Sequence, residues 1–163
     1  NIFSTLIITL SDRASKGEYE DRSGPKVKEA ITTFFEMNRF HHEIDTMIIP
    51  DDEKKLTSVI KEAKGRYDFV FTTGGTGIGP RDITVDVVKP LLDKEIPGIM
   101  DMIRMKYGMK KPNALISRSI AGVMGQTMIF TLPGSVRAVN EYMSEITQVL
   151  RHLVLMLHSI DAH

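Results

Sequence analysis

Three strand and helix units follow one another in the first half of this chain and constrain its fold more than any other feature. Short apolar segments at 4–10, 44–49 and 67–71 have the composition of buried strands. Each precedes a polar turn and a segment with apolar residues at helical spacing. Successive units of this kind give neighbouring parallel strands with right-handed crossovers. The sequence therefore predicts an α/β fold with a mostly parallel sheet, and ligands that bind beyond the carboxyl ends of its strands.

The second half of the chain adds further helices and strands. Its pattern predicts a helix over 96–105, two short strands over 119–130, and a last helix for which Ser135 is a natural N-cap. The methionines at 100, 102 and 105 fit core packing or a subunit contact better than a cofactor site. Residues 104–118 carry five basic side chains and no acidic one. They form either a solvated face or a positive rim for an anionic substrate.

The segment 72–84, Thr-Thr-Gly-Gly-Thr-Gly-Ile-Gly-Pro-Arg-Asp-Ile-Thr, joins the third predicted strand to its helix. Its glycines leave backbone N–H groups open to an anion. Thr84 is a candidate N-cap of the helix, whose positive end adds to this effect. The segment lacks the Gly-Lys-Ser/Thr of a P-loop and the third glycine of a dinucleotide fingerprint. We call it the glycine loop and expect it to hold phosphate.

Acidic residues stand at the same predicted edge of the sheet. Asp12 follows the first strand, Asp51 follows the second, and Asp82 lies in the glycine loop. Bound phosphate repels a carboxylate unless a divalent cation lies between them. The alternative for Asp82 is a helix cap, and the alternative for Asp51 and Asp52 is a favourable place in the first turn of a helix. The residues alone leave both explanations open.

Composition and charge argue against several classes of protein. Lys plus Arg equals Asp plus Glu at 21 each, so the overall charge favours neither nucleic acid nor an anionic membrane as a partner. The chain has no cysteine, and no apolar run approaches the ~20 residues of a membrane span. We therefore expect a single cytoplasmic domain over 1–163.

Several kinds of active site are also disfavoured. The five histidines lack metal-ligand spacing, and Ser117 is not in the Gly-x-Ser-x-Gly turn of a hydrolase. The chain has neither the thiols nor the dinucleotide fingerprint that redox enzymes use. Transfer at phosphorus remains, because it needs positioning and charge neutralisation more than a nucleophilic side chain. Carboxylates at two strand ends together with Mg²⁺ would meet that need.

Six segments of the chain, in the same order, resemble the MogA-type molybdopterin adenylyltransferases of molybdenum cofactor biosynthesis. These segments are Ser11–Asp21, Ile49–Asp51, Thr72–Thr84, Glu95–Gly98, Ala114–Arg118 and Leu132–Ser135. The resemblance spans nearly the whole chain and implies the three-layer α/β/α fold of this family. MoaB-type proteins, the central domain of MoeA-type insertases and the gephyrin G domain share that fold and the glycine signature.

The resemblance implies an enzyme that moves AMP from Mg-ATP to the terminal phosphate of molybdopterin and releases pyrophosphate. It also implies a homotrimer and allows contact with a molybdenum insertase. Asp51 and Asp82 match the acidic residues that the family uses for catalysis and metal handling, and Ser117 matches a serine near the pterin phosphate. The residues expected to bind substrate are Ser11, Asp12, Thr73, Gly74, Gly75, Thr76, Gly77, Thr84, Glu95, Ser117, Arg118, Pro133, Gly134 and Ser135.

Two other functions fit the same frame. One is a catalytically silent pterin-binding or scaffold module of the MoaB or gephyrin type. The other is a nucleotide pyrophosphatase, although the Arg81-Asp82 ending of the glycine loop argues against the relatives that cleave pyrophosphate-containing nucleotides.

Overall fold

The sheet in the computed structural model of this protein confirms the predicted α/β fold. The structure describes residues 2–158, whose six strands are β1 (Ile2–Leu10), β2 (His41–Ile49), β3 (Phe69–Thr73), β4 (Lys94–Glu95), β5 (Ala121–Met124) and β6 (Thr127–Leu132). Their order across the sheet is β2-β1-β3-β6-β5-β4. β2, β1, β3 and β6 are parallel, whereas β5 runs antiparallel to β6 and β4. The sheet is mixed, and the predicted strand and helix units form its parallel part.

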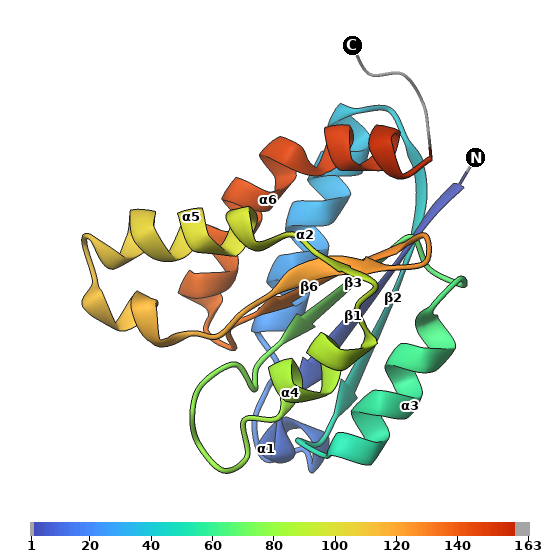
Figure 1. The fold of residues 1–163 in the computed structure, drawn as a ribbon. Coiled ribbons are helices and arrows are strands. Elements are labelled where there is room, and N and C mark those ends of the chain that lie inside the picture. The colour runs from blue at the N-terminus through green and yellow to red at the C-terminus, as the bar shows by residue number, and fades with distance from the viewer. Residues whose placement is uncertain (1, 159–163) are drawn as a thin grey trace.

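Helices cover both faces of the sheet, which gives three layers (Figure 1). The helices on one face are α2 (Ser23–Met37), α5 (Pro97–Gly108) and α6 (Val136–Leu157). Those on the other are α3 (Glu53–Ala63) and α4 (Thr84–Val88). Shorter helices lie in connections, namely α1 (Asp12–Ser15), η1 (Lys89–Leu91) and η2 (Pro112–Ile116). Each face has its own apolar cluster, as a sheet buried on both sides requires.

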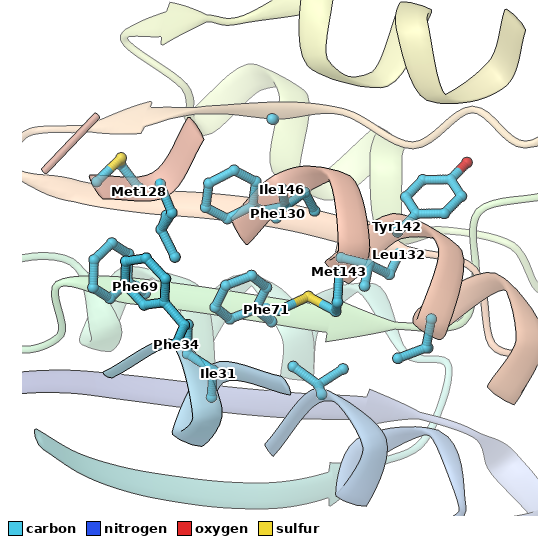
Figure 2. Packing of buried hydrophobic residues seen from close by; sticks show 14 of the residues in the cluster. Ile31, Phe34, Phe69, Phe71, Met128, Phe130, Leu132, Tyr142, Met143 and Ile146 are labelled. Atoms are coloured by element: carbon cyan, nitrogen blue, oxygen red, sulfur yellow. The ribbon is translucent and has the colours of Figure 1, made fainter. Parts of the chain in front are cut away.

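Alternating side chains on β3 divide the core between the two faces. Phe71 belongs to the cluster under α2 and α6, while its neighbour Val70 belongs to the cluster under α3. Phe71 stacks on Phe130 of β6 with 5.1 Å between ring centroids, and Met143 of α6 lies beside it (Figure 2). Buried aromatic pairs of this kind contribute strongly to stability. They fix β3 and β6 side by side at the centre of the sheet.

Strand boundaries differ from the prediction where neighbouring turns take up the backbone groups. β3 covers 69–73 instead of 67–71, because the N–H of Tyr67 donates to the carbonyl of Ala63 in the turn that ends α3. Thr72 and Thr73 instead extend the ladder with β1 and β6. β1 and β2 begin at 2 and 41, earlier than expected. The carboxyl end of β3 therefore reaches the glycine loop directly.

The polar turn that the sequence predicts after β1 begins with a short helix, α1. Ser11 is the N-cap of α1, and its Oγ accepts a hydrogen bond from the N–H of Ala14 at 3.1 Å. The predicted cap at Ser135 is confirmed, because its Oγ accepts from the N–H of Ala138 at 3.1 Å. Serine hydroxyls thus begin helices after both β1 and β6.

No helix within residues 2–158 combines the length and apolar content needed to cross a membrane. α6 is long, at 22 residues, but carries exposed charged side chains such as Arg137 and Arg151. Residue 1 and residues 159–163 of the predicted 1–163 domain, including His163, lie outside the described residues.

Candidate functional site

The glycine loop leaves β3 in a conformation that two glycines make possible. Gly74 and Gly75 have φ values of +92° and +72°, in the left-handed region that other residues rarely adopt. The N–H of Gly74 donates to the carbonyl of Leu132 at the end of β6. The Oγ1 of Thr84 donates to the carbonyl of Gly74 at 2.9 Å. The loop therefore starts against the ends of β3, β6 and α4.

The prediction that Thr84 caps α4 is wrong. Thr84 is the first residue of the helix, and Ile83 occupies the cap position without a side-chain cap bond. The Thr84 side chain is fully buried, and it holds the start of the glycine loop through Gly74. Its predicted contact with substrate stays a prediction, and its observed role is to support the loop.

Asp82 closes the second half of the glycine loop and does not cap a helix. Its Oδ2 accepts a hydrogen bond from the N–H of Gly79 at 2.8 Å. A Cβ on Gly77 would lie 2.8 Å from the same oxygen, so only glycine fits there without a shift. The helix-cap alternative for Asp82 is thus removed, and its carboxylate lies inside the curve of the loop.

Arg118 holds the glycine loop from outside, a role that the sequence did not indicate. Its Nε donates to the carbonyl of Gly77 at 2.9 Å and its Nη2 to the carbonyl of Asp82 at 3.2 Å. Its backbone N–H donates to the carbonyl of Thr76, and its guanidinium pairs with Asp86 at 3.0 Å. The hydrogen bond to Asp86 raises the pKa of Arg118, and the charges of Asp86 and Asp82 raise it further. Arg118 therefore positions the loop that carries Asp82.

Two acidic residues at neighbouring strand ends hold each other in place. The N–H of Asp12 donates to Oδ2 of Asp51 at 3.2 Å, and the N–H of Asp51 donates to Oδ1 of Asp12 at 3.0 Å. Arg81 of the glycine loop then binds both oxygens of Asp12, at 3.0 and 3.1 Å. Asp52, not Asp51, is the N-cap of α3. Asp51 therefore lies outside α3, and the alternative explanation of a place in the first turn of the helix does not apply to it.

The charges at this edge shift the pKa values of Asp12 and Asp51 in opposite directions. The hydrogen bond from Arg81 lowers the pKa of Asp12 below its usual value. Burial raises the pKa of Asp51, and the charges of Asp12 and Asp82 raise it further. Asp82 follows Arg81, whose side chain binds Asp12, and Asp12 is hydrogen-bonded to Asp51. The structure thus brings Asp12, Asp51 and Asp82 together.

Ser117 and the turn 133–135 lie next to the glycine loop. The Oγ of Ser117 donates to Oγ1 of the buried Thr76 at 3.2 Å. A Cβ on Gly134 would lie 3.3 Å from Cα of Gly74, so the turn packs against the loop backbone to backbone. Both segments line a cavity of about 250 Å³ between α5, η2 and the start of α6, which we call the first cavity.

A second cavity, of about 310 Å³, lies across the turn 133–135 from the first. Ser135 lines both cavities, while Ser11 and Thr73 line the second. Glu95, in contrast, is on β4 at the far edge of the sheet, where it lines a separate cavity of about 390 Å³ that Arg118 also lines. The structure therefore gathers the predicted site residues at the carboxyl ends of β1, β2, β3 and β6, with the exception of Glu95. We call this place the site edge.

The basic segment 104–118 is only partly available to a ligand. Arg104 donates to the carbonyls of Ser117 and Ser119, and Lys106 pairs with the buried Glu145 of α6. Lys111 lines the first cavity together with Arg104 and with Arg137 of α6. Fewer of the basic side chains are thus available to form the predicted positive rim than the sequence suggested.

Residues 2–158 contain no group of three or more His, Cys, Asp or Glu side chains placed to hold a metal ion by themselves. The carboxylates at the site edge can therefore bind a divalent cation only together with oxygens from a ligand or water.

Residues 6–152 match a family described as a probable molybdopterin binding domain. The chain is 38% identical over 160 residues to the molybdopterin adenylyltransferase of Pyrococcus furiosus, covering 92% of this chain and 90% of that protein. It is 34% identical to the gephyrin of Dictyostelium discoideum, but spans only 22% of that protein's length. The crystal structure of the tungsten cofactor synthesizing protein MoaB from P. furiosus superposes with a TM-score of 0.84 at 36% identity, covering 95% of this chain and 96% of that one.

We predict that Gly75→Ala destabilises the protein by about 1 to 3 kcal/mol. The new Cβ would lie 2.2 Å from Oγ1 of Thr84 and would hold a non-glycine residue at a φ of +72°. Gly98→Ala is the control, because nothing lies within 4 Å of the Cβ that it adds. Urea denaturation followed by circular dichroism measures both variants. Equal stability of the two would contradict the assigned role of Gly75.

We predict that Asp51→Asn does not lower the free energy of unfolding at neutral pH and raises it by less than about 1 kcal/mol, since the group is partly exposed. The raised pKa means that the folded protein disfavours the ionised form of Asp51, whereas asparagine carries no charge and keeps an acceptor for the N–H of Asp12. This difference in the free energy of unfolding should disappear as the pH falls through the raised pKa of Asp51, because the aspartate is then neutral too.

Thermal denaturation between neutral and acidic pH tests this prediction. Asp52→Asn is the control, because asparagine is an equally good N-cap for α3 and should leave the stability nearly unchanged. A clearly less stable Asp51→Asn protein at neutral pH would show that repulsion and burial at Asp51 do not dominate.

Proposed function

Because this chain belongs to the family of molybdopterin-binding domains of molybdenum cofactor biosynthesis, we propose that it transfers the adenylyl group of ATP to molybdopterin. In this reaction an oxygen of the terminal phosphate of molybdopterin forms a bond to the α-phosphorus of ATP. The bond from that phosphorus to the oxygen shared with the β-phosphate breaks, and pyrophosphate leaves. The relatives named molybdopterin adenylyltransferase support this activity, since the chain matches one of them over 90% of its length.

The observation that carries the proposal is the meeting of carboxylates, backbone amides and two cavities at one edge. Asp51 and Asp82 lie at the glycine loop, and the turn 133–135 joins that loop to both cavities. Each cavity can take one substrate, so that their phosphates meet at the loop between them. Such a reaction depends on positioning and on stabilised charge, which this arrangement supplies.

The first cavity suits molybdopterin. It is lined by the cationic side chains of Arg104, Lys111 and Arg137 and by the rings of Tyr107 and Tyr142. A pterin phosphate is anionic and its ring is flat, so cations and aromatic rings fit both parts. Ser117 lines the same cavity at the side of the glycine loop, in agreement with its expected place near the pterin phosphate.

The carboxylates fit Mg²⁺ bound together with a nucleotide. In Asp51 and in Asp82, Oδ2 accepts a backbone N–H, and Oδ1 makes no hydrogen bond within the described part of the chain. Mg²⁺ in nucleotide sites is commonly held by one or two carboxylates plus phosphate oxygens. When bound, the ion would neutralise charge on the phosphates. Asp51 and Asp82 would hold it, and Asp12 and Arg118 would keep these two carboxylates in place.

A scaffold function without turnover is the second candidate, favoured by the match to a segment of gephyrin. Incubation with molybdopterin, ATP and Mg²⁺ separates it from the first, because only the enzyme forms adenylyl-molybdopterin. Cleavage of ATP without the pterin would instead indicate a nucleotide pyrophosphatase. The cytoplasmic location and the contact with a molybdenum insertase stay predictions.

We predict that Asp82→Ala keeps the fold and lowers turnover at least about a hundredfold, because a lost metal ligand removes several kcal/mol of transition-state stabilisation. Asp93→Ala is a matched control. Asp93 is also a loop carboxylate that accepts a glycine N–H, from Gly125, but it lies near the amino end of β6, away from the site edge. Formation of adenylyl-molybdopterin, followed by chromatography, measures both variants. Wild-type turnover by Asp82→Ala would refute the metal role.

We also propose that the protein forms a homotrimer through an exposed apolar surface on α5 and η2. This surface, the α5 patch, consists of Met102, Met105, Met109, Leu115 and Ile116, with exposed fractions from 45% to 87%. Met102, Met105 and Met109 follow one stripe of the helix. Met100, which the sequence grouped with them, is instead buried in the core.

Sedimentation equilibrium should give a mass of three times 18.3 kDa for the unaltered chain and a lower mass for Met105→Glu, because a buried charge disfavours the contact. Met37→Glu is the control, since Met37 is 79% exposed at the end of α2, outside the patch. A monomeric mass for the unaltered chain, or a trimer in Met105→Glu, would contradict the proposed interface.

A further inference from the structure

Glu145 of α6 is the only charged residue that is buried among residues 2–158, with 6% of its surface exposed. Burial of an unpaired carboxylate carries a large energetic cost, so a buried one needs partners within the fold. The main partners of Glu145 lie on α5. Its Oε1 accepts hydrogen bonds from Nζ of Lys106 and, at 3.1 Å, from the hydroxyl of Tyr107. Two consecutive residues of α5 are thus bound to one point on α6.

The carboxylate of Glu145 fixes the direction of the Tyr107 hydroxyl. The hydrogen bond from Lys106 lowers the pKa of Glu145 below its usual value, so the carboxylate is ionised at neutral pH and can only accept hydrogen bonds. The hydroxyl of Tyr107 must therefore donate to it. Oε2 of Glu145 accepts a longer bond from Nε2 of Gln148 in the same helix, at 3.4 Å. Both oxygens of the carboxylate are thus bound within the fold.

Tyr107 belongs both to this network and to the first cavity. The residue lines the cavity, whereas Glu145 itself does not. Tyr107 is half-buried and packs against the apolar cluster under α5 and α6. A tyrosine has two side-chain torsion angles, and packing of the ring together with a bond at the hydroxyl restricts both. The ring is therefore ordered before a ligand enters the cavity.

Lys106 compensates the buried charge of Glu145 without entering the cavity. Its side chain is 52% exposed, and the residue does not line the first cavity. The cation allows the carboxylate to stay ionised in a buried place, because removal of one partner would leave the other charge uncompensated. Of the side chains bonded to Glu145, only Tyr107 lines the first cavity. An effect of Glu145 on a ligand there must therefore pass through Tyr107.

We propose that Glu145 is a positioning residue for the pterin substrate, because it holds the ring of Tyr107 in the orientation that the first cavity presents to a flat ligand. This inference rests on the proposed adenylyl transfer and on the place of molybdopterin in the first cavity. Glu145 touches no substrate in this arrangement. A wall that is ordered in advance loses little freedom on binding, which favours affinity. Loss of the bond to Tyr107 should weaken pterin binding and leave the chemical step unchanged.

Binding of molybdopterin, followed through the fluorescence of its pterin, tests this role with three variants. Glu145→Met removes the acceptor and nearly keeps the side-chain volume, whereas Tyr107→Phe removes the donor and keeps the ring. Each should weaken molybdopterin binding about fivefold or more, because the loss of one hydrogen bond has effects of this size. Glu145→Gln keeps an oxygen that can accept from Tyr107, so it should retain most of the affinity that Glu145→Met loses.

Tyr67→Phe is the matched control for the loss of a tyrosine hydroxyl. The hydroxyl of Tyr67 also donates to a carboxylate, that of Asp45 at 2.7 Å, but neither residue lines the first cavity. This variant should bind molybdopterin as the unaltered protein does. The double variant of Glu145→Met and Tyr107→Phe should bind no more weakly than either single variant, because both changes remove the same bond. Unchanged affinity in Tyr107→Phe would overturn the proposal without any need for a Glu145 variant.

Steady-state formation of adenylyl-molybdopterin separates the positioning role from the proposed reaction. In Tyr107→Phe the KM for molybdopterin should rise, while kcat and the KM for ATP stay at the values of the unaltered protein. A loss of kcat with an unchanged KM for molybdopterin would overturn the positioning role alone. Binding of molybdopterin without turnover by the unaltered protein would refute adenylyl transfer and leave the comparison of affinities valid. Failure of the unaltered protein to bind molybdopterin would overturn both proposals.

Discussion

Close backbone contact at two glycines is the constraint on which the site depends. Gly74 lies so near β1 that a Cβ there would be 2.5 Å from the carbonyl oxygen of Leu10, and Gly134 packs against Gly74 itself. Three strand ends therefore converge without side chains between them. The surface that results is made of peptide groups, and it brings the loop with Asp82 within electrostatic range of Asp51. Side chains at these two positions would push apart the groups that the reaction needs together.

Contacts within the chain hold the acidic residues at the site edge. Arg81 binds both oxygens of Asp12, and Arg118 bridges the loop to Asp86. These pairs are exposed and contribute little to stability by themselves. Their effect is to fix geometry, so that one carboxylate, Asp51, keeps an unfavourable charge in the folded protein. A site that keeps such a charge is suited to a cation that relieves it.

The sequence predicted the parts of this site that depend on local pattern. Apolar segments and helical spacing located the parallel strands, and the polar residues after them indicated which edge would hold Asp12, Asp51 and the glycine loop. The contacts by which Arg81 and Arg118 hold the site were not predicted, because they join residues that are far apart in sequence. Arg81 reaches a residue 69 positions away. No local pattern records such a contact.

Thr84 shows a second limit of predicting structure from the sequence pattern. A threonine before an apolar stripe is a normal N-cap, yet Ile83 before it has helical dihedral angles, whereas a capping residue is extended. The helix therefore begins at Thr84, one residue earlier than predicted, and the threonine hydroxyl bonds to the glycine loop. Loop geometry, which sequence spacing does not contain, decided the outcome. The same reason explains why α1 was missed, since four residues give too little periodicity to detect.

The two cavities draw their walls from different parts of the chain and share only the turn 133–135. One is lined mainly by α5, η2 and α6, the other by the residues that follow β1 and begin α2. Substitutions that change the ring accepted on one side would therefore leave the other side almost untouched. Selection could therefore change which substrate binds in one cavity while the chemistry between the two substrates stayed constant. This makes the fold easy to adapt in evolution.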